Sequence, residues 1–197
     1  MQPGALDADP DRNEMRRKIQ AALANRVRHA VNDPALTCAA VLIPLLFRDG
    51  EWWVLVTQRT RHVEHHKGQI SFPGGACDPE DASLEATALR EAHEEIGIPP
   101  DAVEILGALD DLPTITDFVV TPVVGVIPHS FPYRLNQCEV AAVVEVPLSF
   151  LRDPGKLRVE QREYKGQGHD VLFWDYGSHV IWGATARILK SFLDLLP

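Results

Sequence analysis

Residues Gly74 to Ile98 read GGACDPEDASLEATALREAHEEIGI, and most of what the sequence predicts starts from this stretch. Its apolar side chains recur every fourth residue, at Leu84, Ala88, Ala92 and Ile96. That period is typical of the buried stripe of an amphipathic helix, and Gly97 directly after it is a typical left-handed helix stop. The sequence therefore predicts a helix that packs on the protein through one face and stops at Gly97.

The start of this helix has two candidate capping residues. Asp78 suits the N-cap, because Pro79 would then occupy the first helical position and Asp81 would lie three residues past the cap. Asp81 is the alternative N-cap. Both alternatives place the helix start within the segment DPED.

Three glutamates lie on the helix face next to the apolar stripe. Glu91, Glu94 and Glu95 share this face, and Arg90 lies one turn from Glu94. Like charges this close repel unless a cation neutralises them. Ligands made only of oxygen suit hard cations such as Mg2+ or Mn2+, which bind one or two carboxylates and bridge to substrate phosphates. The spacing predicts a divalent-metal site for cutting a pyrophosphate.

This order of residues resembles the Nudix box, in which a glycine and a distant acid precede R-E-x-x-E-E-x-G and an aliphatic residue. Two positions depart from the usual box: Asp81 replaces the Glu that follows the glycine, here Gly75, and eight residues instead of seven separate it from Arg90. An ordinary solvated acidic helix is the alternative, but it would seldom show this order behind Phe-Pro-Gly-Gly. The resemblance implies an α+β Nudix hydrolase, with a mixed β-sheet in an α/β/α sandwich.

The resemblance also implies roles for individual residues. Glu91 and Glu95 are expected to ligate the metal, with Glu94 adding a direct or water-mediated contact. The general base in this family is a glutamate whose place varies, and Glu94 is our favoured candidate. Arg90 is expected to orient a glutamate. Glu139, at the start of a predicted strand, lies where family members often supply a further ligand or base, although a glutamate at a strand start is otherwise ordinary.

A narrower resemblance covers the segment just upstream, LVTQRTRHVEHHKGQISFPGG, which ends at Gly75. It is similar to the coenzyme A pyrophosphatase branch of the family and keeps the spacing of that branch. Glu64 departs, because the branch has an arginine there. Arg59 and Lys67 are candidates for binding a substrate phosphate, and Gly74 and Gly75 for letting the backbone approach a ligand closely. A surface arginine at a strand end is the alternative for Arg59.

This branch resemblance implies hydrolysis of coenzyme A, or an acyl form of it, to 3',5'-ADP and 4'-phosphopantetheine. Glu64 favours an alternative substrate such as ADP-ribose, NADH or another nucleoside diphosphate derivative. A catalytically silent nucleotide sensor is an alternative from a different class, but such modules commonly lose acids of the box, and this chain keeps all three. In each case the expected partner is a small nucleotide.

Runs that favour strands surround the box. They are 41–47, 52–57, 103–109, 119–127, 139–146, 157–163 and 169–176, and a last helix is predicted over 182–196. Asp49-Gly50 predicts a tight hairpin between the first two runs, and Phe72 to Gly75 is expected to end a short strand. Residues 1–10 are predicted to be a mobile tail, and 11–197 a single domain that opens with a helix over 11–30.

Composition limits the partners and the location. The 19 basic and 28 acidic residues give a net charge of −9, which argues against a nucleic-acid surface. No apolar run is long enough to span a membrane, so no membrane anchor is expected. Cys38, Cys77 and Cys138 are odd in number and lack metal-ligand spacing, which predicts no disulfide and a reducing, cytoplasmic setting. The oligomeric state stays open.

Overall fold

The computed structural model describes residues 9–60, 68–164 and 166–196 of this chain. In chain order the elements are α1 (Pro10–Ala24), β1 (Thr37–Arg48), β2 (Glu51–Arg59), β3 (Ile70–Ser71), β4 (Gly74–Ala76), α2 (Leu84–Ile96), the 3-10 turn η1 (Pro100–Ala102), β5 (Glu104–Ala108), β6 (Leu112–Pro113), β7 (Phe118–Val126), β8 (Val140–Pro147), α3 (Leu148–Arg152), the 3-10 turn η2 (Pro154–Lys156), β9 (Leu157–Tyr164), β10 (Gln167–Tyr176), β11 (His179–Trp182) and α4 (Gly183–Leu193). Each predicted strand is found, with small differences at the ends.

The central sheet is built around β1. This strand pairs in parallel with β7, from Thr37 opposite Phe118 to Leu45 opposite Val126, and antiparallel with β2 and β4. Its sequence TCAAVLIPLLFR is a nearly continuous apolar run, as expected for a strand covered on both faces. The sheet has eight strands along the order β3-β2-β1-β7-β5, with β4, β6 and β8 as side branches. It is therefore mixed, as predicted.

The hairpin at Asp49-Gly50 is confirmed. Arg48 lies opposite Glu51, so only two residues connect β1 to β2. Both have positive φ, 55° at Asp49 and 79° at Gly50, which a type I′ turn requires. This turn sets the register of β2, the strand that ends at Arg59.

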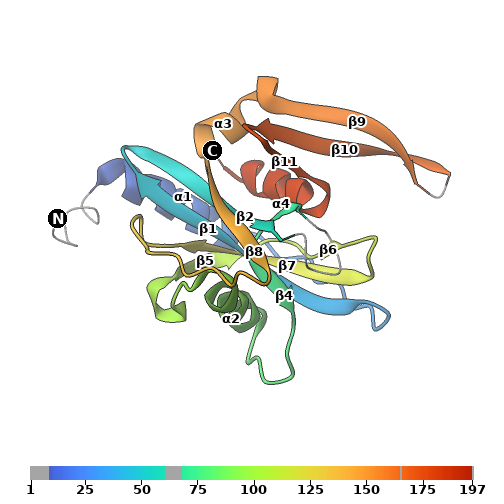
Figure 1. Cartoon of the computed structure of the whole chain (residues 1–197), viewed down its shortest axis with the longest axis horizontal. Helices are drawn as coiled ribbons and strands as arrows, with labels where there is room; N and C mark the ends of the chain where they lie inside the picture. Colours follow the sequence, from blue (N-terminus) through green and yellow to red (C-terminus); the bar gives the residue numbers. More distant parts are fainter. Residues whose placement is uncertain (1–8, 61–67, 165, 197) are drawn as a thin grey trace.

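Helices cover both faces of the central sheet (Figure 1). The small side chains of Ala88 and Ala92 bring α2 onto one face, against Ala40, Leu42 and Val123. The helix α4 packs on the opposite face within the larger cluster, through side chains that include Ile188, Leu189 and Phe192. This arrangement confirms the α+β class and the α/β/α sandwich. It also turns the glutamate face of α2 toward β4.

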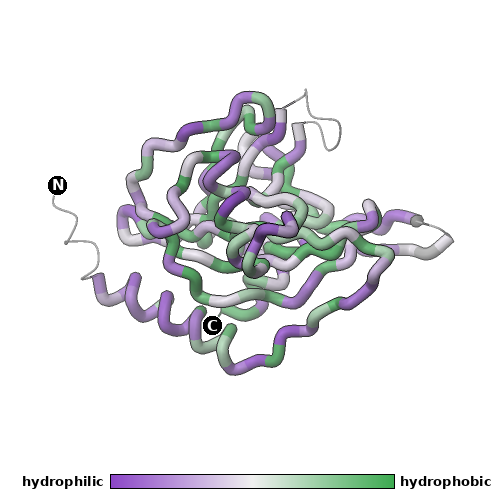
Figure 2. Tube along the Cα trace, turned by 90° about the horizontal axis from the view of Figure 1, so that it is seen from below, coloured by the Kyte–Doolittle hydropathy of each residue, from purple (hydrophilic) through white to green (hydrophobic). Residues whose placement is uncertain are grey.

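A second, three-stranded sheet follows in the order β11-β10-β9, and its β9–β10 hairpin extends away from the body of the molecule (Figures 1 and 2). The strand β11 was not predicted; it lies directly before α4, whose predicted start at residue 182 is off by one. Trp174 and Ile181 bury this sheet against the core. No helix in the described part of the chain is long and apolar enough to cross a membrane.

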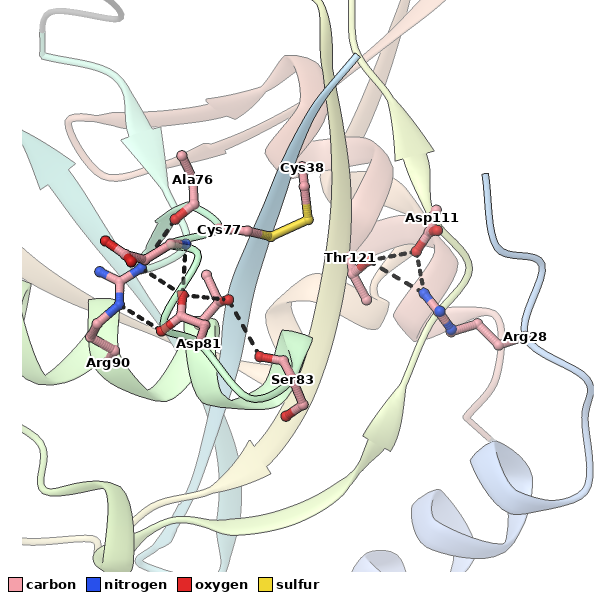
Figure 3. The surroundings of a disulfide bond; sticks show 11 residues. Arg28, Cys38, Ala76, Cys77, Asp81, Ser83, Arg90, Asp111 and Thr121 are labelled. Carbon is pink, nitrogen blue, oxygen red and sulfur yellow. Dashed lines mark hydrogen bonds and ion pairs between the residues drawn. A yellow bond between two sulfur atoms is a disulfide. The ribbon is translucent and has the colours of Figure 1, made fainter. Parts of the chain in front are cut away.

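The predicted helix over 11–30 is wrong at both ends. Asp9 caps α1, Pro10 begins it and Asn25 ends it. The residues beyond it bond instead to the turn after β5: the backbone N–H of His29 donates to Asp110, and Arg28 bonds to Asp111 (Figure 3). These contacts draw the chain away from the helix axis, a competition that helical periodicity does not reveal.

The predicted start of α2 is also wrong. Ser83, not Asp78 or Asp81, is the N-cap, and its hydroxyl accepts from the backbone N–H of Ala86 at 3.1 Å. Asp81 is unavailable as a cap, because its carboxylate accepts from the backbone N–H of Asp78 at 2.9 Å and from the hydroxyl of Thr87 at 2.8 Å. The other predictions for this helix are confirmed: its apolar stripe faces the core, and Gly97 ends it with φ 79°.

A disulfide joins Cys38 to Cys77, which overturns the predicted absence of one (Figure 3). The cause is the pairing of β4 with β1: Ala39 lies opposite Ala76, and the next pair along brings the cysteine Cα atoms to 5.4 Å. Cys138 is the remaining thiol, and it is exposed. The odd count therefore did not exclude one bond, and the cysteine content no longer supports a reducing setting.

Breaking this disulfide should lower the stability of the fold. The cysteines are 39 positions apart. Cross-linking a loop of that size lowers the conformational entropy of the unfolded chain and stabilises the folded state by about 4 kcal/mol. We expect Cys38→Ser, or a reductant, to lower the midpoint of thermal unfolding by about 10 °C. Differential scanning calorimetry measures this, with Cys138→Ser as the control that leaves the midpoint unchanged. An unfolding midpoint that does not change when reductant is added would contradict the presence of the Cys38–Cys77 disulfide.

Candidate active site

Arg90 in α2 forms an ion pair with Asp81 in the loop before this helix (Figure 3). The guanidinium donates from Nε to Asp81 Oδ1 at 2.9 Å and from Nη2 to Oδ2 at 3.0 Å, which is a two-pronged contact. The Asp81 side chain is only 8% exposed. The hydrogen bonds from Arg90 hold the pKa of Asp81 well below its usual range. Asp81 thus stays charged and fixes the plane of the guanidinium.

The same guanidinium positions the first glutamate of the box. Arg90 Nη1 donates to Glu91 Oε1 at 2.8 Å, and Nη2 donates to the carbonyl oxygen of Ala76 at 3.1 Å. Its contact with Glu94 is longer, 3.4 Å to the nearer oxygen, and the Glu94 side chain is 54% exposed. Arg90 therefore connects the loop before α2 to Glu91 and only loosely to Glu94.

Gly75 brings the backbone of β4 directly against Glu91. A Cβ at this position would lie 2.6 Å from the Glu91 carboxylate, closer than any side chain allows. Gly74 has φ 156°, and a Cβ there would lie 2.4 Å from the carbonyl oxygen of Ala40 in β1. These glycines begin β4 instead of ending a strand, which corrects the prediction. Both are needed to pack the site itself.

Glu95 is the most buried charged group of the site. Its side chain is 3% exposed, and burial raises its pKa to about 8. The backbone N–H of Gly74 donates to it and Arg59 Nη1 lies 3.9 Å from its Oε1, but both effects are weaker than the burial. Its Oε2 has no hydrogen-bond partner among the residues that the structure describes. A buried carboxylate with an open oxygen is a favourable place for a cation.

Glu139 approaches the same place from the other side. The backbone N–H of Thr60, at the end of β2, donates to the Glu139 carbonyl at 2.8 Å, so the residue before β8 lies next to the strand end that carries Arg59. Asn136 Nδ2 donates to Glu139 Oε1 at 3.0 Å. The negative charge of Glu139 raises the pKa of both Glu91 and Glu95, after the larger effect of burial. The three carboxylates therefore lie near enough for their charges to interact.

The structure gathers most of the predicted site residues. Around the carboxylates of Glu91, Glu95 and Glu139 it places Arg59, Arg90, Gly74 and Gly75. Glu94 lies at the exposed margin. Lys67, and Glu64 of the branch segment, fall outside the described residues. Each role predicted for these residues stays a prediction.

A divalent cation fits these residues through their chemistry. In the described ranges no three His, Cys, Asp or Glu side chains stand together as a complete ligand set. Mg2+ does not need one, since it binds one or two carboxylates and keeps waters and substrate phosphates as its other ligands. The open Oε2 of Glu95, and Glu91 held against Gly75, are compatible with these two glutamates as the residues that would hold it.

The sequence did not predict the contact of Asn136 with Glu139, the ion pair of Asp81 with Arg90 or the helix cap at Ser83. Asn136 forms a local turn, in which its Oδ1 accepts from the backbone N–H of Cys138 at 3.1 Å, while its amide reaches Glu139. An Asn in a loop indicates such a turn, because its side chain can accept from the backbone N–H two residues on, but it does not indicate the contact with a glutamate. The contact depends on the bond from the backbone N–H of Asn136 to the carbonyl of Glu95, which only the fold creates.

Comparison with known proteins agrees with this geometry. The NUDIX domain family matches residues 36–163. A Nudix hydrolase NudL of Salmonella newport, named as uncharacterized, is 47% identical over 153 residues, which cover 78% of this chain and 79% of the relative. The NudL of Salmonella dublin is equally similar.

A solved structure supports the fold. The MutT/nudix family protein from Enterococcus faecalis aligns with 99% of this chain and 75% of its own, with a TM-score of 0.54 and 15% identity. Together with the family match over residues 36–163, these similarities lead to one conclusion. The chain belongs to the Nudix hydrolase family, whose members cleave a pyrophosphate bond in nucleoside diphosphate derivatives and generally use divalent metal cations.

Proposed function

We propose that this chain hydrolyses the pyrophosphate bond of coenzyme A, or of its acyl derivatives, to 3',5'-ADP and 4'-phosphopantetheine with Mg2+ or Mn2+. The observation that supports this proposal is the position of two residues of the segment that resembles the coenzyme A pyrophosphatase branch. Its strand β2 brings Arg59 to 3.9 Å from Glu95, and its last glycine, Gly75, lies against Glu91. The described residues on either side of 61–67 in the segment similar to coenzyme A pyrophosphatases thus reach the carboxylates of Glu95 and Glu91.

The chain's own residues would divide the work as follows. Glu91 and Glu95 would hold the cation, with Glu94 contributing from the margin. Arg90 would keep the Glu91 carboxylate aimed at the cation through the contacts described above. A bound divalent cation would offset the charge of the phosphoryl oxygens and make a water more acidic. Arg59, and Lys67 outside the described residues, would bind substrate phosphate.

Two glutamates compete as the general base. Glu139 is half-buried, is held by Asn136 and lies near enough for its charge to act on Glu91 and Glu95. Glu94, favoured from the sequence, has a side chain that is 54% exposed and leans toward Arg90. A base must reach the attacking water beside the cation, so the geometry favours Glu139. Replacing each by Gln and comparing kcat distinguishes them.

A second substrate class follows from Glu64. A carboxylate where the branch carries an arginine would repel a substrate phosphate, which favours ADP-ribose, NADH or another nucleoside diphosphate derivative over coenzyme A. This alternative keeps the same carboxylates and the same reaction. It differs only in the group attached to the diphosphate.

The substrate proposal is tested with purified protein and Mg2+ on coenzyme A, acetyl-coenzyme A, ADP-ribose and NADH. We expect the highest kcat/KM with a coenzyme A substrate and 3',5'-ADP as a product, resolved by chromatography. A higher kcat/KM with ADP-ribose or NADH would contradict the coenzyme A assignment but keep the reaction. Binding without cleavage of any substrate would instead indicate a nucleotide sensor.

Replacing Glu91 should abolish most turnover without unfolding the chain. Glu91→Gln keeps the shape of the side chain but removes the charge that holds a cation. Mutating residues that only support metal ligands typically lowers metal affinity or activity by about ten- to a hundredfold. Because Glu91 is proposed to contact the metal directly, we expect kcat to fall by at least about a hundredfold. Glu80→Gln is the matched control, because Glu80 is exposed in the loop before α2. Equal turnover of the two variants would exclude a metal role for Glu91.

Metal-free protein should become less stable as pH rises. The pKa of Glu95 is about 8 in the folded chain and near 4.5 when exposed, so the folded state binds this proton more tightly. Its stabilising effect is complete below the unfolded pKa and is lost as pH rises toward 8. We expect the unfolding midpoint of wild type, measured with a chelator present, to fall across this window relative to that of Glu95→Gln.

Adding Mg2+ extends this experiment. A cation beside ionised Glu95 should raise the wild-type midpoint more at the top of the pH window than at its bottom, because protons compete with the metal for the carboxylate. Glu95→Gln should lose most of this increment. Parallel pH profiles of the two proteins, with and without Mg2+, would show that Glu95 neither titrates in this window nor binds the metal.

A further inference from the structure

The strand β9 has an unused edge. It lies at the end of the three-stranded sheet, and β10 pairs with its inner edge from Leu157 opposite Trp174 to Tyr164 opposite Gln167. Within the part of the chain that the structure describes, no strand pairs with its outer edge. Figures 1 and 2 show the β9–β10 hairpin extending from the body of the molecule, so this edge is accessible. Its row of backbone N–H and C=O groups can pair with another strand.

This edge lacks most of the features that protect edge strands. Its eight residues, LRVEQREY, contain no proline, and the pairing with β10 is regular, without a bulge. Val159 is 51% exposed on this strand, unlike most apolar residues of the chain. Charged residues are present, but Arg158, Glu160 and Arg162 alternate in sign along one face. Such a pattern repels some incoming strands and attracts others.

We propose that two copies of this chain pair antiparallel through β9, with a twofold axis at Val159. In this register Arg158 of each copy lies opposite Glu160 of the other, so two ion pairs form across the interface. Val159 meets its own counterpart at the axis and loses its exposure to water. The pairing would join the two three-stranded sheets into one. It goes beyond the proposed hydrolysis and concerns a surface outside the active site.

Neighbouring registers are less favourable. An axis at Glu160 would place this carboxylate opposite itself and Arg158 opposite Arg162, which are all like-charge pairs. An axis at Gln161 would pair Glu160 with Arg162 but place Val159 opposite the Glu163 carboxylate. Because side chains alternate between faces, a twofold axis must lie on a residue. On the other side of Val159, an axis at Arg158 would place this arginine opposite itself, which is again a like-charge pair. Only the register centred on Val159 satisfies both the charges and the apolar side chain.

The charged groups of β9 can exchange ion pairs within one copy for ion pairs between two copies. Within one copy Arg158 contacts Asp175 and Glu160, and Arg162 also contacts Glu160. Their side chains are between 37% and 52% exposed, and ion pairs this exposed contribute at most about 1 kcal/mol. A contact between single edge strands is small compared with stable dimer interfaces, so the dimer should be weak and depend on protein concentration.

Charge reversal on one strand at a time tests the pairing. Arg158→Glu places Glu opposite Glu in the dimer, and Glu160→Arg places Arg opposite Arg, so each variant alone should stay monomeric. A mixture of the two should form a dimer, because every opposing pair then has opposite signs. Sedimentation velocity over a wide concentration range, with one variant fluorescently labelled, measures the homodimers and the heterodimer separately.

Arg162→Glu is the matched control. It removes an exposed ion pair with Glu160 in the same strand. In the proposed register residue 162 lies opposite Lys156, just before β9, so a glutamate there adds no like-charge pair and association should persist. Circular dichroism and hydrolytic activity should be unchanged in all three variants. A wild-type chain that stays monomeric at every concentration would overturn the proposal, as would a dimer insensitive to Arg158→Glu or a mixture that fails to associate. Loss of the dimer in Arg162→Glu would overturn the register.

Discussion

The carboxylate of Glu95 is removed from water without full compensation, and the rest of the site depends on that burial. One oxygen lies 3.9 Å from the Arg59 guanidinium, while the other has no hydrogen-bond partner in the described part of the chain. Burying a charged carboxylate costs free energy unless hydrogen bonds or opposite charge replace the lost water. Glu91 and Glu139 add negative charge nearby and increase that cost. The site is thus built to gain most from a divalent cation.

The neighbouring cluster of Asp81, Arg90 and Glu91 has the opposite character. There the guanidinium uses its donors on Asp81, Glu91 and the carbonyl of Ala76, so charges and hydrogen bonds are well matched. A matched cluster favours one geometry and holds it. The protein therefore combines a rigid support, which orients Glu91, with the unmatched carboxylate of Glu95, which a cation would stabilise. The two functions lie on successive turns of the same helix.

Local signals in the sequence were sufficient for the elements that local interactions determine. The four-residue apolar period and Gly97 located α2, because packing and the left-handed stop act on that segment alone. Asp49-Gly50 located the hairpin for the same reason. The order of charges in α2 also brought Glu91 and Glu95 together correctly, since helix geometry sets their separation.

What the sequence could not show depends on partners far along the chain. Ser83 became the cap because Arg90 engaged Asp81, and α1 ended early because Asp110 and Asp111 bind the residues after it. The disulfide depends on the register of β4 against β1, which no count of cysteines contains. Asn136 reaches Glu139 only because its backbone is tied to the end of α2. Each of these contacts joins residues that only the folded chain brings together, so the sequence alone did not predict it.

The double pairing of β1 has a consequence for how the protein is made. Its parallel neighbour β7 lies far downstream, beyond the glutamates of α2, so a ribosome produces β1, β4 and the whole box before that neighbour exists. Until then one side of an apolar strand has no partner, and the helix has only part of the surface on which it packs. Glu139 emerges later still. The nascent chain therefore carries every residue of the Nudix box before the strand that completes their support has been made, and it gathers all the carboxylates of the site only after Glu139 has followed.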